Sequence, residues 1–477
     1  MVCLGMKDAC SRLFSCPDMT AEDRTSIVYL FTGKQKIGKP KRKEVSQKMK
    51  TSTKNLTTQK KNSFVRALAL LLTALLLVTV LPLGVMAEEA ADTAPTIQTT
   101  LRDGTIQKGS KKAFDVWAKD AAGNKIAATV TLNGNKLSPT WDDSAKTSYT
   151  LSFTQSNIGE NTVKISAEAD GKTTERTYTI NYVGAKEGDS IGYAYLSVEL
   201  FTIGCSYLVK PTRVEIFEGE TSAEVLLRVL SESGYCAYYG GTPKSGFYMG
   251  YVSDGDNAET RYSGYTGSGI SKNPKKLELD PKIPEYLESH VENYIDVDDF
   301  TKNFEGYLGE FDISFMSGWM YAVNNVAPNV GMADYYLGDG DVMRVQFTLA
   351  YGLDIGASES MGGFMGPNYY DVANRDALTK TIADVASRFL DGSEENAEIA
   401  KAYADAIAMA ETLNAPQDKI NAANAALTNA VEARKAALVG TGDDTVIAAI
   451  TFAVSATLLT VITVSFVIEK KKAGKNS

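Results

Sequence analysis

Hydrophobic and polar residues alternate along residues 93–184, and this period of two is typical of β-strands. In AFDVWAKD the alternation puts Phe114 and Val116 on one face of a strand. The stretches SYTLSFT and NTVKISAEAD follow the same rule, and the turn sequences AAGNK, LNGNK and ADGKT separate such segments. We therefore expect an all-β antiparallel sandwich. Its core should hold Trp117 and Trp141, with carbohydrate stacking as the alternative use of these two rings.

Residues 190–355 change from strand periodicity to helix periodicity and back. The segments AYLSVELFTIG and KPTRVEIFEGE alternate, whereas TSAEVLLRVLSESG repeats apolar residues at intervals of three and four. Thr221 or Ser222 suits the N-cap of this helix, and Gly234 suits its end. Two strands, one helix and further strands open an α+β, β-grasp-like domain. An insertion over residues 253–312, rich in Tyr, Gly and acidic residues, interrupts it.

Residues 366–437 carry the apolar spacing that predicts α-helices. The segments DALTKTIADVASRFL, AEIAKAYADAIAMAETL and APQDKINAANAALTNAVEARKAAL are separated by Gly-Ser and Asn-Ala-Pro breaks. Three helices of this length predict a small antiparallel bundle. The pattern resembles the helical module "found in various architectures" of Gram-positive surface proteins. The Ala-rich faces of the helices indicate close helix packing and a stalk beside the cell wall, with ligand binding as the alternative.

The amino-terminal region differs from the rest of the chain in charge. Residues 1–87 hold 15 Lys and Arg against 5 Asp and Glu, while the whole chain of 477 residues has a net charge of -9. The apolar run ALALLLTALLLVTVL follows a basic flank, and small residues end at Ala87. We predict a signal peptide over residues 49–87, cleaved after Ala87, with a retained membrane anchor as the alternative. Residues 1–48 are predicted to be a spurious upstream extension.

The carboxyl terminus, residues 438–477, reads LVGTG, then 24 residues without a charge from Thr445 to Ile468, then three lysines. Such an apolar span is long enough to cross a bilayer as a helix, and the lysines would hold the tail in the cytoplasm. This order resembles the cell-wall sorting signal of Gram-positive surface proteins, in which a sortase cuts between Thr and Gly of Leu-Pro-x-Thr-Gly.

Leu438, Thr441 and Gly442 match the sorting motif, but Val439 stands where the motif has proline. The resemblance implies a sortase as a partner, and a plain C-terminal transmembrane helix is the alternative. Both interpretations leave residues 88–440 outside the cell, anchored to the cell membrane or the cell wall.

Two motifs, SGWMYAVNN and LGDGDVMRVQFTLAYG, resemble strands of the transcobalamin-like C-terminal domain family. The matching residues are Gly318, Trp319, Tyr321, Val323 and Asn324, followed by Gly340, Asp341, Val342 and Met343. The resemblance implies a β-grasp domain that binds a soluble ligand. Cobalamin or another corrinoid is then expected as a ligand and not as a catalytic cofactor. The resemblance does not fix the ligand, because this chain has no helical barrel of the size that the vertebrate cobalamin carriers use.

Strand alternation puts Trp319 and Tyr321 on one face. An indole and a phenol two residues apart form an apolar surface with polar tips, which suits a flat ligand or a sugar. Trp319, Tyr321 and Asn324 are therefore the candidate ligand-binding residues. The alternative is that this face packs under the helix, and that Asn324 and Asn325 only form a turn.

The segment GENTVKISAEADGKTTERTYTINY resembles the last hairpin of bacterial immunoglobulin-like domains, two strands joined by an Asp-Gly turn. This resemblance implies a spacer or an adhesive unit for the predicted sandwich.

Patterns for catalysis and metal binding are missing from the sequence. It has one histidine, His290, and no GxSxG elbow, Gly-rich phosphate loop or Cys-His pair, so we expect no enzyme. The acidic stretches 254–257 and 296–299 lack the spacing of a calcium loop, which favours no metal site. The acidic exported part argues against nucleic acid as a partner. Cys205 and Cys236 could form one disulfide outside the cell or stay as two buried thiols.

Two functional hypotheses remain for this multi-domain chain. The first is a surface-anchored receptor that binds a corrinoid, another small ligand or a glycan. The second is an adhesive or structural surface protein that binds a glycan or a host macromolecule.

Overall fold

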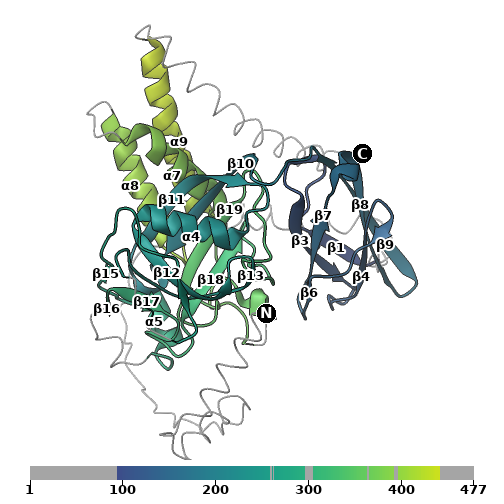
Figure 1. The fold of residues 1–477 in the computed structure, drawn as a ribbon, viewed down its shortest axis with the longest axis horizontal. Coiled ribbons are helices and arrows are strands. Elements are labelled where there is room, and N and C mark those ends of the chain that lie inside the picture. The colour runs from purple at the N-terminus through teal and green to yellow at the C-terminus, as the bar shows by residue number, and fades with distance from the viewer. Residues whose placement is uncertain are drawn as a thin grey trace, which may run out of the picture. The chain divides into compact units, whose positions relative to one another are not determined.

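The computed structural model describes residues 94–257, 260, 263–295, 304–361, 365–390 and 396–440, and Figure 1 shows the fold. The predicted extension, the signal peptide with its cleavage at Ala87, and Thr441 and Gly442 of the sorting motif lie outside these residues. The apolar span from Thr445 to Ile468 lies outside them as well. No helix within the described part of the chain combines the length and the apolar character that a membrane span requires.

The predicted sandwich is confirmed as two packed sheets. One sheet has the order β1-β3-β7-β6, and the other has the order β2-β9-β8-β4-β5. Neighbouring strands are antiparallel except for β2 and β9, which run parallel. The strands are β1 (Thr96–Thr99), β2 (Thr105–Gln107), β3 (Lys111–Lys119), β4 (Ala128–Leu132), β5 (Asn135–Lys136), β6 (Trp141–Asp142), β7 (Thr147–Ser152), β8 (Gly159–Ala169) and β9 (Lys172–Tyr182), with a 3₁₀ turn η1 (Gln155–Asn157) before β8.

The prediction that Trp117 and Trp141 fill the sandwich core is wrong. Phe114 and Val116 point inward on β3, so the period of two turns Trp117 to the opposite face. Trp141 lies on the two-residue edge strand β6 and is half-buried outside the core. The core between the sheets consists of smaller aliphatic side chains with stacked pairs such as Phe153 and Tyr182, whose centroids are 5.0 Å apart.

A second domain, which we call the mixed-sheet domain (residues 190–361), contains the predicted opening strands and helix. Its first sheet has the order β11-β10-β19-β18, formed by β10 (Ser190–Glu199), β11 (Tyr207–Phe217), β18 (Gly318–Val323) and β19 (Val342–Thr348). The central strands β10 and β19 are parallel, whereas the two outer pairs are antiparallel. The helix α4 (Ser222–Ser233) begins with a capping box of Thr221 and Glu224 and ends at Gly234, whose φ of 101° favours glycine.

A second sheet of this domain, which the sequence patterns did not predict, has the order β14-β12-β13-β17. Its strands are β12 (Tyr235–Thr242), β13 (Ser245–Asp254), β14 (Thr266–Gly267) and β17 (Tyr307–Gly309). The predicted insertion 253–312 is therefore partly built into the fold. It also contains α5 (Glu285–Val291) and the short pair β15 (Glu278–Leu279) and β16 (Phe304–Glu305).

One apolar cluster joins the parts of the mixed-sheet domain. It includes Leu196 and Val345 from the first sheet, Leu226 from α4 and Val252 from the second sheet. Complete burial of such side chains contributes about 1.5–3 kcal/mol each. Two 3₁₀ turns, η2 (Phe201–Ile203) and η3 (Ser358–Met361), complete the described elements of this domain.

Three helices follow, as predicted: α7 (Asp376–Phe389), α8 (Ala397–Glu411) and α9 (Gln417–Gly440), which pack through a shared apolar cluster (Figure 1). The helix α7 also contacts β11, β10 and β19, so it covers the face of the first sheet opposite α4. Leu438 lies in α9.

Two buried arginines sit where α7 meets the sheet. Arg344 on β19 pairs with Glu199 on β10 through contacts of 2.9 and 2.7 Å, and Ser197 donates a hydrogen bond of 2.7 Å to the same carboxylate. Arg375, just before α7, is 1 % exposed and donates hydrogen bonds to the carbonyl oxygens of Ala373, Ala410, Thr412 and Leu413. The carbonyls near the end of α8 would otherwise lack partners.

A buried carboxylate, Asp354, gives the fold a pH dependence. It is completely buried, accepts a 2.6 Å hydrogen bond from Leu349 N and accepts another from the Thr348 hydroxyl. Burial outweighs these hydrogen bonds and raises the pKa of Asp354 to about 6. Because the folded-state pKa lies above the unfolded-state value of about 3.9, the stabilising contribution is present at low pH. It is lost as pH rises through about 6.

We expect Asp354 to lower the free energy of unfolding by about 1.4 kcal/mol when pH rises from about 5 to about 7.5. Urea unfolding at both pH values measures the change. Asp354→Asn does not titrate at this position, so the variant should lack this part of the pH dependence. An identical pH dependence in the variant and the wild type would show that Asp354 ionises normally.

Candidate functional site

The rings of Trp319 and Tyr321 face the interior of the mixed-sheet domain. Both residues lie on β18. Their partners on the neighbouring strand β19 are Phe347 and Val345, which belong to the apolar clusters. The indole Nε1 of Trp319 donates to Leu308 O at 3.4 Å, and the Tyr321 hydroxyl donates to Val330 O at 2.6 Å. The structure thus favours the alternative in which this face packs inside. The structure gives no support to an open aromatic platform formed by Trp319 and Tyr321.

The other face of β18 is covered too. Met320 packs against a small cluster that contains Phe201, Ile355 and Leu413. A Cβ atom added at Gly352 would lie 2.8 Å from the Met320 sulfur, so the loop backbone approaches the strand closely.

Tyr321→Phe should lower the free energy of unfolding by about 1 kcal/mol, because it removes one buried hydrogen bond while keeping the ring. Chemical denaturation measures the difference. Tyr336→Phe is the matched control, since the Tyr336 hydroxyl accepts only an exposed hydrogen bond from Lys111, and it should change stability little. A neutral Tyr321→Phe would mean that the hydroxyl is not used inside the fold.

Asn324 has the turn role that the sequence suggested, together with a contact that the sequence did not reveal. Asn324 and Asn325 have φ values of 51° and 61°, which confirms the turn. The Asn324 side chain donates to Asp341 Oδ1 at 2.8 Å and accepts from Val342 N at 3.0 Å. Asp341 also accepts from Gly338 N at 2.7 Å. The two motifs therefore bind each other and fix the ends of β18 and β19.

A cavity of about 310 Å³ lies between the sandwich and the mixed-sheet domain. Its lining comprises residues 99–102, Thr105, 112–115 and 148–150 of the sandwich, and Val323, Asn324, Val326, Pro328, Val330, Tyr335, Asp339 and Asp341 of the mixed-sheet domain. Asn324 is thus the one candidate ligand residue of the three that lines this cavity.

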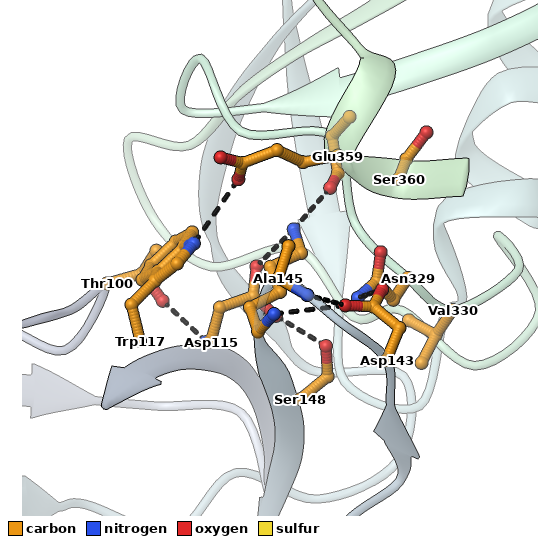
Figure 2. Close-up of polar contacts among 12 residues, drawn as sticks. Thr100, Asp115, Trp117, Asp143, Ala145, Ser148, Asn329, Val330, Glu359 and Ser360 are labelled. Atoms are coloured by element: carbon orange, nitrogen blue, oxygen red, sulfur yellow. Dashed lines mark hydrogen bonds and ion pairs between the residues drawn. The ribbon is translucent and has the colours of Figure 1, made fainter. Parts of the chain in front are cut away.

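Buried polar contacts beside the cavity join the two domains, and we call this region the junction. Lys146 is completely buried, lies 3.0 Å from Asp115 Oδ2 and donates to Ala327 O at 2.5 Å. Asn329 donates to Asp143 Oδ2 at 2.6 Å. The indole of Trp117 donates to Glu359 at 3.2 Å, and Figure 2 shows the side chains of Trp117 and Glu359 facing each other.

Sequence reasoning missed the junction, although Trp117 carried a signal for it. The alternation that turns Phe114 and Val116 inward puts Trp117 on the outward face of β3, where a large apolar ring is available for contact with another surface. The structure supplies that surface through residues of the mixed-sheet domain.

The cavity brings groups of both charges together. Arg102 and Lys112 come from the sandwich, and Asp339 and Asp341 come from the loop before β19. The Asp339 carboxylate is held in place because it accepts a hydrogen bond of 2.9 Å from Tyr193 N. The lining therefore offers both donors and acceptors, an arrangement that suits a ligand with several hydroxyl groups.

The remaining candidate residues lie away from the cavity. Cys205 and Cys236 are free thiols, so the structure shows the unpaired alternative. Asp254 and Asp256 both pair with Lys276 at 3.0 Å, and the ring of His290 stacks on Tyr369 with centroids 4.6 Å apart. Among the residues that the structure describes, no three His, Cys, Asp or Glu side chains come together as metal ligands.

Comparisons with known proteins add little. No family model matches the chain, and no curated protein matches it. Solved structures give partial likenesses with low TM-scores. Domains 1–6 of the surface layer protein SbsC match with 14% identity over 37% of this chain and 26% of that chain, with a TM-score of 0.20.

Human protocadherin-24 EC1-2 matches with 13% identity over 32% of this chain and 70% of that chain, with a TM-score of 0.15. Tandem Ig repeats of Dlar match with 11% identity over 37% and 83%, with a TM-score of 0.17. The chain spans about a quarter of the compared length of the surface layer protein. Likeness at this level carries no argument about function.

Proposed function

We propose that the chain is a non-enzymatic protein displayed outside the cell, and that it binds a saccharide-sized ligand in the junction cavity. The signal-like and anchor-like sequences at the two ends support display. The observation that carries the binding proposal is the cavity itself, whose walls combine Arg102 and Lys112 with Asp339 and Asp341.

The size and chemistry of the cavity favour a sugar. Pockets for drug-sized ligands span roughly 300–1,000 Å³, and 310 Å³ is at the small end of this range. Sugar hydroxyls both donate and accept hydrogen bonds, which matches a lining with both kinds of group. A corrinoid macrocycle with its side chains is too large for this volume. We therefore propose the resemblance to transcobalamin-like domains for the fold only, and not for the ligand of this cavity.

The direct test is a glycan array probed with the purified full-length chain, followed by titration of each saccharide that is retained. Thr150→Phe places a ring in the cavity, because Thr150 lies on its wall, and should weaken binding at least tenfold. Thr129→Phe is the matched control, since Thr129 is an exposed strand residue on the other sheet.

Two results would count against this proposal. Unchanged affinity in a folded Thr150→Phe variant would remove the cavity from the site. Saturable binding of cobalamin without binding of any saccharide would favour the corrinoid interpretation instead.

The second candidate function is adhesion to a macromolecule, and the junction favours it. Contacts such as those of Lys146 with Ala327 O and of Asn329 with Asp143 hold the sandwich and the mixed-sheet domain together, which suits a protein that bears load at a surface. This function predicts binding to a glycoprotein or to cells that free saccharides do not inhibit.

A further inference from the structure

A carboxylate between two phenols forms a separate cluster on the second sheet of the mixed-sheet domain. Tyr248 on β13 and Tyr265, just before β14, both donate their hydroxyl hydrogens to Glu310, one to each carboxylate oxygen. Glu310 follows β17, the neighbour of β13 in the sheet (Figure 1). Three segments that are distant in the sequence therefore meet at one carboxyl group.

The backbone holds this cluster in place. Glu310 N donates to Gly250 O at 2.9 Å, which ties the residue to β13. A Cβ atom at Gly250 would lie 2.7 Å from the Tyr265 ring, so that ring rests on the glycine backbone. Phe311 N donates to Ser317 O at 3.1 Å and fixes the next residue. The cluster is thus built on strands and a tight turn.

Aromatic surface beside Glu310 remains open. Tyr248 is 40 % exposed and Phe311 is 38 % exposed. The Tyr265 ring also contacts Tyr251 edge to face, with centroids 6.1 Å apart. An accessible ring face attracts cations through its quadrupole.

Within the described residues, no basic side chain balances the charge of Glu310. Its hydrogen-bond partners are the two phenols, and no Lys or Arg in the described part of the chain pairs with it. Burial and the negative charge of Glu310 raise the pKa of Tyr248 above its usual value, so this phenol stays protonated and keeps donating. With both phenol hydrogens used, the group presents negative charge and free lone pairs to a ligand.

From this arrangement we infer that Tyr248, Tyr265, Glu310 and Phe311 form a binding site for an ammonium group. The carboxylate supplies charge complementarity, and the exposed rings supply cation–π contacts. The group could come from a lysine side chain, an amino sugar or a quaternary amine, which share this chemistry. The site is independent of the junction cavity and of the function proposed for it.

Titration calorimetry of the full-length chain with n-butylammonium, glucosamine and choline tests the inference and separates the three sources. We expect saturable binding of at least one probe, weakened by added salt because screening reduces the charge attraction. The neutral isostere of choline, 3,3-dimethylbutanol, should not bind. Failure of all three cations to bind would overturn the inference, and so would equal binding of the neutral isostere.

Two variants assign the binding to this cluster. Glu310→Gln keeps the shape and removes the charge, and should weaken binding of the retained cation at least tenfold, whereas Glu285→Gln on the exposed face of α5 should leave it unchanged. If Glu310→Gln does not fold, Tyr248→Phe replaces it, with a smaller loss expected. Retained affinity in a folded variant would place the cation elsewhere and refute the inference.

Discussion

Arg375→Met should lower the free energy of unfolding by about 4 kcal/mol, because it leaves several buried carbonyl oxygens without donors. The guanidinium group is the donor for Ala373, Ala410, Thr412 and Leu413, which connect α8 to the start of α7. Burial lowers the pKa of Arg375 to about 10, so the group is still protonated at neutral pH. Denaturant unfolding followed by far-ultraviolet circular dichroism measures the loss.

Arg388→Met is the matched control for Arg375→Met. Arg388 is exposed on α7, so its replacement should change the free energy of unfolding by no more than about 0.5 kcal/mol. Equal losses in the two variants would show that Arg375 does not join the helices to each other.

Glu199→Gln should cost about 3–5 kcal/mol, because it leaves the Arg344 guanidinium group buried without a charge partner. Both side chains are nearly inaccessible, and α7 covers the sheet face that carries them. Thermal and urea unfolding both report the change. The exposed pair of Lys401 and Asp405 provides the control, since Asp405→Asn should have a small effect.

A double variant separates the ion pair from its surroundings. Glu199→Leu combined with Arg344→Met removes both charges, and it should be less destabilised than either single variant. Simple additivity of the two single losses would mean that the two side chains do not interact in the folded protein.

The sequence predicted the elements whose signals are local. The alternation around Phe114, the capped helix after Thr221 and the three helices after residue 366 are present where their patterns placed them. The turn at Asn324 was also predictable, because asparagine tolerates positive φ. Each of these features depends on residues within a few positions of one another.

The features that were missed depend on contacts between distant residues. Lys146 pairs with Asp115, 31 positions away, and its carbonyl partner Ala327 is 181 positions away. The inward direction of Trp319 depends on which sheet face α4 covers, and a strand pattern with apolar residues on both faces does not specify this. In the second sheet, the outer strands β14 and β17 were missed because they are only two and three residues long.

Ligand binding in the junction cavity depends on the junction, since the cavity exists only if the sandwich and the mixed-sheet domain keep one relative position. Spin labels on noncanonical residues at the exposed positions Glu168 and Glu232, one in each domain, allow electron–electron double resonance to measure their separation in the full-length chain. The account predicts one narrow distance distribution, which broadens in Lys146→Met. A broad distribution in the wild type would contradict the account, because no fixed cavity would then exist between the domains.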